Sequence, residues 1–170
     1  AVGRFREHGI HVAVSSPQTS ELCEDKYATC RHLQSRGIAA APSWLPHELP
    51  ARMPFPLFIK PRRGRGGVGA YPVQNARELD FFVDYVPDPV VQAYLDGAEF
   101  TIDMLCDFTG QPLSIVPRRR DVIRAGVSDR GRTVNDPALI QVARTCAATL
   151  QFAGAVNIQC RVVDRTPVVF

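Results

Sequence analysis

Hydrophobic and polar residues alternate along much of this chain, which is typical of half-buried β-strands. The alternation is clearest over residues 99–107, where apolar residues occupy the even positions and the odd positions include Thr101 and Asp103. Shorter apolar runs predict further strands at residues 11–15, 55–60, 68–73, 90–95, 113–116, 154–163 and 167–170. Turns separate several neighbouring strands, so these are expected to pair antiparallel.

Helical spacing is found between the strands. One helix is expected to start within residues 17–20, and further helices are expected at residues 26–36, 75–85 and 136–152. Gly37 follows the second in the position that commonly ends a helix. Asn75 and Asp136 predict the starts of the last two, and Thr19 or Ser20 is expected to cap the first.

Residues 118–135 break this pattern. The segment is long, basic and without periodicity, so we expect a loop of the kind that often carries active-site residues. The other elements alternate between strand-turn-strand steps and single helices. That order favours an α+β fold with mainly antiparallel sheets.

The segment at residues 55–69 carries the first chemical signal. A predicted strand ends at Lys60, and Gly64, Gly66, Gly67 and Gly69 follow within six positions, with arginine nearby. Glycines let backbone N–H groups turn toward an anion, and cations supply charge, so the segment suits phosphate. An exposed basic hairpin loop is the alternative interpretation. Because a strand follows rather than a helix, Rossmann and Walker-type phosphate loops are disfavoured.

Two further segments place polar groups beside predicted strands. Glu99 follows the strand and turn at residues 90–97, whose end can offer backbone groups to a purine while the glutamate accepts from ribose. Asn157 and Gln159 share one strand face and can hold magnesium or a phosphate oxygen. Ordinary surface positions on strands are the alternative for all three residues.

Arginines form a third group. Arg118, Arg119 and Arg120 end a predicted strand, and Arg124 follows beside a glycine and a hydroxyl residue. Planar guanidinium groups suit phosphate or carboxylate. A solvated basic turn is the alternative interpretation.

Composition narrows the class of protein. The 170 residues are 45% hydrophobic and 22% charged, as in an ordinary globular protein, and the formal net charge is only +3. That charge is too small to indicate nucleic-acid binding by bulk electrostatics. The five cysteines are widely spaced and include no CxxC pair, so neither a zinc site nor a disulfide framework is expected. We expect a cytoplasmic protein, since no apolar run approaches a membrane span and no signal peptide is visible.

The order of these motifs resembles that of the ATP-grasp superfamily, particularly carbamoyl-phosphate synthetase large subunits and related carboxylate–amine ligases. The resemblance covers about residues 12–170 and includes segments 14–16, 23–26, 33–38, 59–69, 92–103, 117–128 and 157–159. It implies two lobes with mainly antiparallel sheets that enclose a nucleotide cleft. Residues 21–170 would be the ATP-grasp domain, with a small lobe at about 52–92, and residues 1–20 the tail of a preceding α/β domain.

The resemblance also implies roles for single residues, with ATP and Mg²⁺ as cofactors. The residues that would bind nucleotide are Lys26, Lys60, Gly64, Gly66, Gly67, Gln92, Ala93, Leu95, Glu99 and Asn157, and Gln159 would be a magnesium ligand. Arg118, Arg120 and Arg124 would face the phosphates and the acceptor substrate as catalytic residues. The implied reaction transfers the γ-phosphoryl of ATP to a small-molecule carboxylate, and an amine or similar nucleophile then displaces phosphate.

Two departures from the family pattern affect these expectations. Ala93 stands where relatives often have an acidic residue, so a side-chain contact with adenine is expected to be missing. The strand at residues 167–170 stops before the glutamate with which the family holds magnesium, so we expect a chain truncated at both ends that is inactive or impaired by itself.

Two other functions stay open. One is a non-catalytic nucleotide-binding module of the same fold. The other is a basic nucleic-acid-binding domain, which is disfavoured because interleaved, exposed aromatics are lacking. No membrane partner is expected, and a homodimer is left open.

Overall fold

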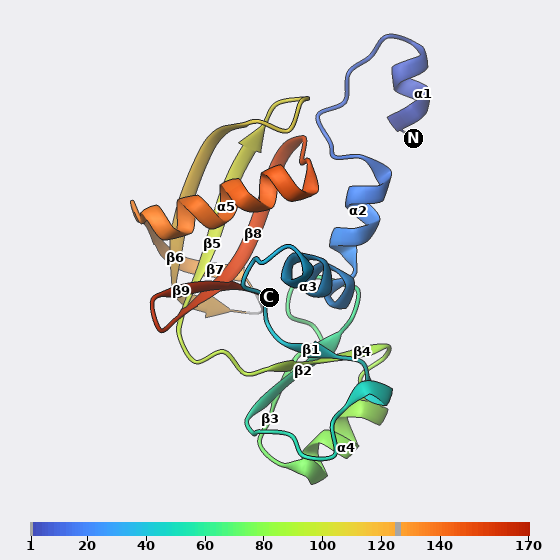
Figure 1. Ribbon diagram of the computed structural model, residues 1–170, viewed down its shortest axis with the longest axis vertical. Helices are drawn as coiled ribbons and strands as arrows, with labels where there is room; N and C mark the ends of the chain where they lie inside the picture. The colour runs from blue at the N-terminus through green and yellow to red at the C-terminus, as the bar shows by residue number, and fades with distance from the viewer. Residues whose placement is uncertain (1, 125–126) are drawn as a thin grey trace.

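The computed structural model of the chain describes residues 2–124 and 127–170. In this part, the strands form a four-stranded and a five-stranded sheet, and helices pack beside both (Figure 1). Every pairing between named strands is antiparallel. The predicted α+β fold with mainly antiparallel sheets is therefore confirmed.

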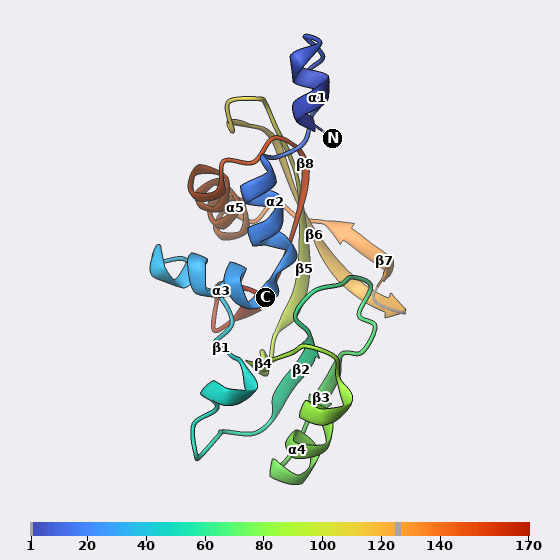
Figure 2. The ribbon, with the colours of Figure 1, turned by 90° about the vertical axis from the view of Figure 1, so that its right-hand side faces the viewer.

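The five-stranded sheet, with helix α5, forms the large lobe. Its strand order is β7-β6-β5-β8-β9, from β5 (Ala98–Cys106), β6 (Pro112–Arg124), β7 (Val127–Thr133), β8 (Gly154–Val163) and β9 (Thr166–Val169). Helix α5 (Pro137–Leu150) covers one face of the sheet (Figures 1 and 2). Ile102 of β5 and Leu139 of α5 are fully buried in the core between them. The apolar face predicted for residues 99–107 packs here, so the opposite face is left for polar residues.

The four-stranded sheet, with helix α4, forms the small lobe. Its strand order is β1-β4-β2-β3, from β1 (Ser43–Trp44), β2 (Leu57–Pro61), β3 (Tyr71–Val73) and β4 (Pro89–Ala93). The turn η1 (Pro46–Glu48) follows β1, and α4 (Ala76–Tyr85) packs beside the sheet (Figure 1). Leu57 and Ile59 are fully buried in the core of this lobe. Phe58 and Lys60 alternate with them and so point to the opposite face.

Three helices precede the sheets. Helix α1 (Val2–Glu7) lies apart from both sheets in Figures 1 and 2, and α2 (Pro17–Glu24) and α3 (Lys26–Ser35) follow it. The prediction of Thr19 or Ser20 as the cap of α2 is wrong. Ser16 caps this helix by accepting a hydrogen bond of 3.1 Å from the N–H of Thr19. Pro17 explains the earlier start, because proline fits the first helical position.

Other helix signals are confirmed. Helix α3 ends before Gly37, whose φ of +74° places it in the left-handed region, and whose N–H bonds to the carbonyl of Gln34. The side chains of Asn75 and Asp136 accept hydrogen bonds from the first turns of α4 and α5, respectively. These capping signals are local, which is why the sequence alone could predict them.

Two predicted strands differ in the structure: one is reduced to an isolated bridge, and the other begins later. At residues 11–15, Val14 forms an isolated bridge to Gly154, and no named strand covers this segment. Strand β3 begins at Tyr71 instead of residue 68, because Gly67 and Gly69 have φ values of +68° and +70° and continue the turn. A left-handed residue cannot belong to a regular strand.

The loop predicted at residues 118–135 is also wrong: this segment forms most of the long β6–β7 hairpin. Residues 125–126, within that segment, lie outside the described residues. Ion pairs join side chains along the hairpin, since Asp121 contacts both Arg119 (3.4 Å) and Arg132 (3.6 Å). Polar pairs replace the apolar alternation that normally reveals a strand, so periodicity could not show it.

Within the described residues, no helix combines the length and the apolar character needed to cross a membrane. The five cysteines are free thiols, and all except Cys23 are buried. A free cysteine in a core behaves as a small hydrophobic residue.

Candidate functional site

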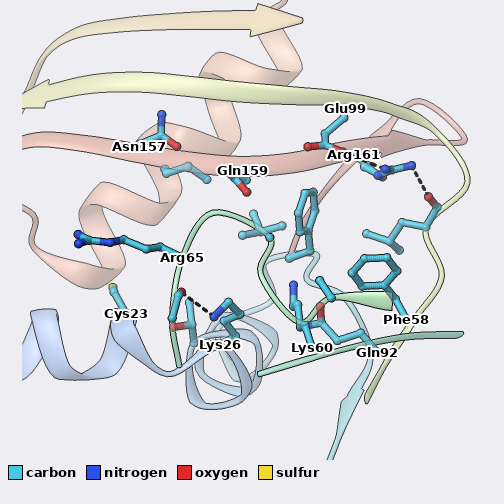
Figure 3. Close-up of a pocket in the computed structure, with 18 of the residues that line it drawn as sticks. Cys23, Lys26, Phe58, Lys60, Arg65, Gln92, Glu99, Asn157, Gln159 and Arg161 are labelled. Carbon is cyan, nitrogen blue, oxygen red and sulfur yellow. Dashed lines mark hydrogen bonds and ion pairs between the residues drawn. The ribbon is translucent and has the colours of Figure 1, made fainter. Parts of the chain in front are cut away.

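A cleft with a volume of about 660 Å³ lies between the two lobes (Figure 3). Its walls come from β2 and β4 of the small lobe, from β5 and β8 of the large lobe, and from the glycine-rich loop at residues 63–70. We call residues 94–97, which join β4 to β5, the interlobe connection. The cleft therefore forms where the chain passes from one sheet to the other.

Most of the predicted site residues meet in this cleft. All ten predicted nucleotide-binding residues line it, and so do Gln159 and Arg120. Arg118 lies on the same sheet face, where its Nε donates to Oδ2 of Asp103 at 2.9 Å. Arg124 ends β6, and its side chain lies outside the described part of the chain. The structure thus gathers these residues, and their roles remain predictions.

Lys60 is a deeply buried cation of the cleft. The residue is 7% exposed, and its Nζ lies 5.0 Å from the centre of the Phe170 ring. The pKa of Lys60 is lowered from 10.5 to about 8, mainly because burial disfavours the charged ammonium; the nearby Lys26 acts in the same direction, and Cys30 and Glu99 act in the opposite one. No hydrogen-bond acceptor or ion-pair partner for its ammonium is found among residues 2–124 and 127–170. A desolvated cation facing a cleft suits an anionic ligand.

Gln92 uses its side chain within the protein. The residue is 2% exposed, and its Nε2 donates to Oγ of Ser43 at 2.8 Å and contacts Sγ of Cys30 at 3.3 Å. Strand β4 pairs with both β1 and β2 at this residue, which fixes its backbone. Because pairing on both sides occupies the backbone groups of β4 at this residue, backbone contacts with a ligand are expected from the interlobe connection that follows the strand.

Lys26 holds the base of the glycine-rich loop. Its Nζ donates to the carbonyl oxygens of Pro61 (3.1 Å), Arg62 (3.4 Å) and Gly64 (2.9 Å), as Figure 3 shows in part. Burial lowers the pKa of Lys26, and the charge of Asp25 acts in the opposite direction. Its ammonium thus positions the loop in this structure, beside its predicted role at phosphates.

Asp25 also helps to hold the base of the glycine-rich loop, through an ion pair with Arg62. Its carboxylate oxygens share the single N–H of Arg62 Nε, at 3.0 Å from Oδ1 and 2.9 Å from Oδ2, and Oδ2 also accepts from Nη2 at 2.6 Å. It also caps α3 by accepting from the N–H of Ala28. Burial raises the pKa of Asp25, but the Arg62 and Ala28 hydrogen bonds outweigh it, so the pKa lies below its usual value. We call Asp25, Lys26 and Arg62 the loop clasp.

On the opposite wall, Glu99 is held between two arginines. Its Oε1 accepts from Nη1 of Arg120 at 2.5 Å and its Oε2 from Nη2 of Arg161 at 2.9 Å. The strand register places the three residues side by side on β6, β5 and β8. Charge-assisted pairs of this kind fix the direction of a carboxylate.

Asp103 lies on the same face of β5, four residues after Glu99, and contacts polar residues of the neighbouring strands. It accepts from Arg118, and its Oδ1 accepts from Nδ2 of Asn157 at 2.8 Å. Gln159 lies between these two levels, opposite Thr101. The sheet face thus carries one row of carboxylate, amide and guanidinium groups. Among the described residues, no cluster of three His, Cys, Asp or Glu side chains could hold a metal by itself.

Sequence reasoning missed three residues that shape this site: Asp25, Arg62 and Arg161. The last lies two positions after Gln159, on the strand face already predicted to be polar, so alternation could have indicated it. Asp25 and Arg62 had no such signal. They are 37 residues apart, and only the fold brings them together.

Gly97 is expected to be intolerant of any side chain. A Cβ atom added there would lie 2.1 Å from the carbonyl oxygen of Val162, a backbone atom of β8. We expect Gly97→Ala to lower the free energy of unfolding by about 1–3 kcal/mol, because overpacking forces the backbone to move. Urea denaturation measures this change. Gly3→Ala is the control, because its added Cβ meets no atom within 4 Å, and equal stability of the two variants would contradict the prediction.

A comparison with protein families identifies the family of this chain. A family model described as "ATP-grasp in the biosynthetic pathway with Ter operon" matches residues 85–170, about half of the chain. The chain belongs to the ATP-grasp family. The resemblance inferred from the order of its motifs is therefore confirmed.

Individual relatives carry the same family relationship. The D-alanine–D-alanine ligase of Marinomonas sp. (strain MWYL1) is 30% identical over 113 residues, which cover 61% of this chain and 36% of the relative. The carbamoyl phosphate synthase large chain of Deinococcus deserti is 29% identical over 187 aligned residues, covering 96% of this chain and 18% of the relative. The chain thus spans only about a third or less of these relatives.

A solved structure shows the same fold. The biotin carboxylase from Campylobacter jejuni, crystallised as a complex with a form of ATP, superimposes with a TM-score of 0.82 at 17% identity. The superposition covers 99% of this chain and 44% of that chain. The predicted ATP-grasp fold is therefore confirmed.

Proposed function

We propose that this chain is the ATP-binding part of an ATP-dependent ligase that activates a carboxylate as an acyl phosphate for attack by an amine or similar nucleophile. The observation that carries the proposal is the desolvated Lys60 ammonium, which faces the interlobe cleft and forms no ion pair with a carboxylate of the described residues. Family membership supports the same class of reaction.

The shape and charge of the cleft fit ATP. Gly64, Gly66 and Gly67 have φ values of +118°, +73° and +68°, so the loop exposes backbone N–H groups that side chains do not cover. Lys60 and Arg120 supply positive charge on opposite walls. Phosphates are bound in this way by glycine-rich loops and cations together. At the other end, the interlobe connection offers backbone groups to adenine, and Glu99 offers a carboxylate to ribose.

The polar face of the large lobe fits Mg²⁺ less completely. Gln159 offers an amide oxygen, and Asp103 and Asn157 lie one strand step away. Magnesium prefers oxygen ligands and commonly keeps water and substrate phosphates in its shell, so few protein ligands are needed. We propose Gln159 as the ligand from this part of the protein.

The protein's part in the reaction would be positioning and charge neutralisation. ATP supplies the phosphoryl group and Mg²⁺ neutralises charge on the phosphates. Lys60 and the glycine-rich loop would hold the phosphate chain, while Arg118, Arg120 and Arg124 would orient the acceptor carboxylate. Phosphoryl transfer requires mainly such electrostatic support, so no protein nucleophile is needed.

Isothermal titration with MgATP, MgADP and AMP-PNP tests nucleotide binding by this chain. We expect a dissociation constant of about 1–100 µM for MgATP. Glu99→Ala is expected to weaken binding at least about 10-fold, because a charged hydrogen-bond partner is lost. Glu21→Ala, exposed on α2, is the control and should leave binding unchanged. Failure to bind any nucleotide, together with salt-sensitive binding to RNA or DNA, would favour the nucleic-acid-binding interpretation instead.

The ligase step is tested in the full-length protein, because this chain spans about a third of its relatives. We expect ADP release that depends on one small carboxylate, with the acyl phosphate trapped by hydroxylamine. Nucleotide binding without carboxylate-dependent ADP release, across a panel of carboxylates and amines, would favour a non-catalytic module of the same fold.

A further inference from the structure

Arg161 connects three features of the cleft through one guanidinium group. Its Nη1 donates to the carbonyl oxygen of Leu95 at 3.1 Å and contacts that of Gly97 at 3.4 Å. Its Nη2 donates to Oε2 of Glu99 at 2.9 Å. Figure 3 shows this side chain between Glu99 and the interlobe connection. A single residue of β8 thus fixes both the connection and the carboxylate.

Both oxygens of Glu99 are held. Arg120 binds Oε1 and Arg161 binds Oε2, and the Glu99 side chain is only 12% exposed. Because the two arginines approach from the neighbouring strands β6 and β8, the carboxylate cannot rotate without breaking one pair. An ionised carboxylate offers about four lone-pair sites, so it can still accept hydrogen bonds from a ligand.

We propose that Arg161 is a positioning residue that gives the cleft its selectivity for nucleotides that carry the ribose 2′- and 3′-hydroxyls over nucleotides that lack them. It acts by holding Glu99 in the orientation that accepts from ribose hydroxyls, and by fixing the interlobe connection at the nucleoside end. This inference rests on the proposed function, in which Glu99 faces ribose.

The chemistry of the side chain explains why arginine is suited to this position. The guanidinium is a rigid plane whose nitrogens donate in fixed directions, so Nη1 and Nη2 serve the connection and Glu99 together. Lysine carries one ammonium on a flexible stem and does not impose both directions. Methionine keeps the apolar stem and donates no hydrogen bond.

The test compares dissociation constants of MgATP and of 2′,3′-dideoxy-ATP, measured by isothermal titration. We expect the unaltered chain to prefer MgATP by about 10-fold or more, since two hydroxyl contacts are lost in the analogue. Arg161→Met is expected to lower this ratio to about 1–2, mainly by weakening the binding of MgATP. Arg161→Lys is expected to give an intermediate ratio. Arg144→Met, exposed on α5 away from the cleft, is the control and should keep the full ratio.

The ratio separates positioning from a purely structural role. A variant that merely loosens the fold weakens the binding of both nucleotides equally and leaves the ratio of their dissociation constants unchanged. An unchanged ratio in Arg161→Met would overturn the inference. Equal affinity of the unaltered chain for both nucleotides would also overturn it, while leaving the proposed function intact. Failure of the unaltered chain to bind MgATP contradicts the proposed function itself. If Arg161→Met does not fold, an unreduced ratio in Arg161→Lys overturns the inference.

Discussion

Replacing Lys60 with methionine is expected to stabilise the unliganded chain and to weaken MgATP binding by about 10- to 100-fold. Lys60 is buried, and its pKa is lowered to about 8, so keeping this residue protonated at neutral pH lowers the stability of the fold. Methionine fills a similar volume beside Phe170 without a charge. The ammonium is thus expected to serve the ligand at a cost to the protein.

The pH dependence follows from the direction of this shift. The folded pKa of about 8 lies below the value of 10.5 for an unperturbed lysine, so the unfolded chain binds the proton more tightly. Burying the charged Lys60 therefore lowers the stability of the fold by its full amount below about pH 8. This loss disappears as the pH rises from about 8 to about 10.5. We expect the difference in stability between Lys60→Met and the unaltered chain to be largest below pH 8 and to close above it.

Thermal unfolding from pH 6 to 10 measures this difference, with a rise in Tm of about 3–8 °C expected at pH 7. Lys26→Met is the matched control, because Lys26 donates to three carbonyl oxygens of the loop and its loss should lower Tm. A Lys60→Met variant that is less stable than the unaltered chain at neutral pH, or that binds MgATP equally well, would contradict the prediction.

Replacing Asp25 is expected to have the largest effect on stability at the loop clasp. Asp25→Asn keeps a side chain that can cap α3 and removes the charge paired with Arg62, so a loss of about 2 kcal/mol is expected. Asp25→Ala removes both and should lose about 3 kcal/mol, because Arg62 keeps its charge without the partner. Both variants should also loosen the base of the glycine-rich loop.

Urea denaturation between pH 3 and 7 tests this expectation. The pKa of Asp25 is lowered in the fold, so its stabilising effect is complete above the usual carboxyl pKa and is lost as pH falls through the folded value. The difference between Asp25→Asn and the unaltered chain should therefore be constant near neutral pH and narrow in acid. Glu24→Gln, at an exposed neighbouring position, should change little. An Asp25→Asn variant with unaltered stability at pH 7 would rule out the clasp as a stabilising unit.

Much of the candidate nucleotide site could be proposed from the sequence because its signals are local. The glycine-rich loop after Lys60 and the alternation around Glu99 each depend on residues within about ten positions of one another. Their order along the chain was enough to indicate the family, and the helix caps at Asn75 and Asp136 were equally local.

The partners of these residues were not predictable in the same way. The sequence predicted Lys26 at phosphates and Glu99 at ribose. It could not show that Lys26 donates to three carbonyl oxygens of the loop or that two arginines donate to Glu99. The β6–β7 hairpin was taken for a loop for the same reason, because side-chain ion pairs leave no apolar period.

The glycine-rich loop illustrates both sides of this division. The sequence by itself determined that a cation and four glycines follow a buried strand, since backbone freedom and charge are properties of single residues. Only the tertiary structure decided what the loop is fastened to and what it faces. Those contacts join residues such as Asp25 and Arg62, which are far apart in the sequence. The fold brings them within hydrogen-bonding distance, at the start of α3 and just after β2.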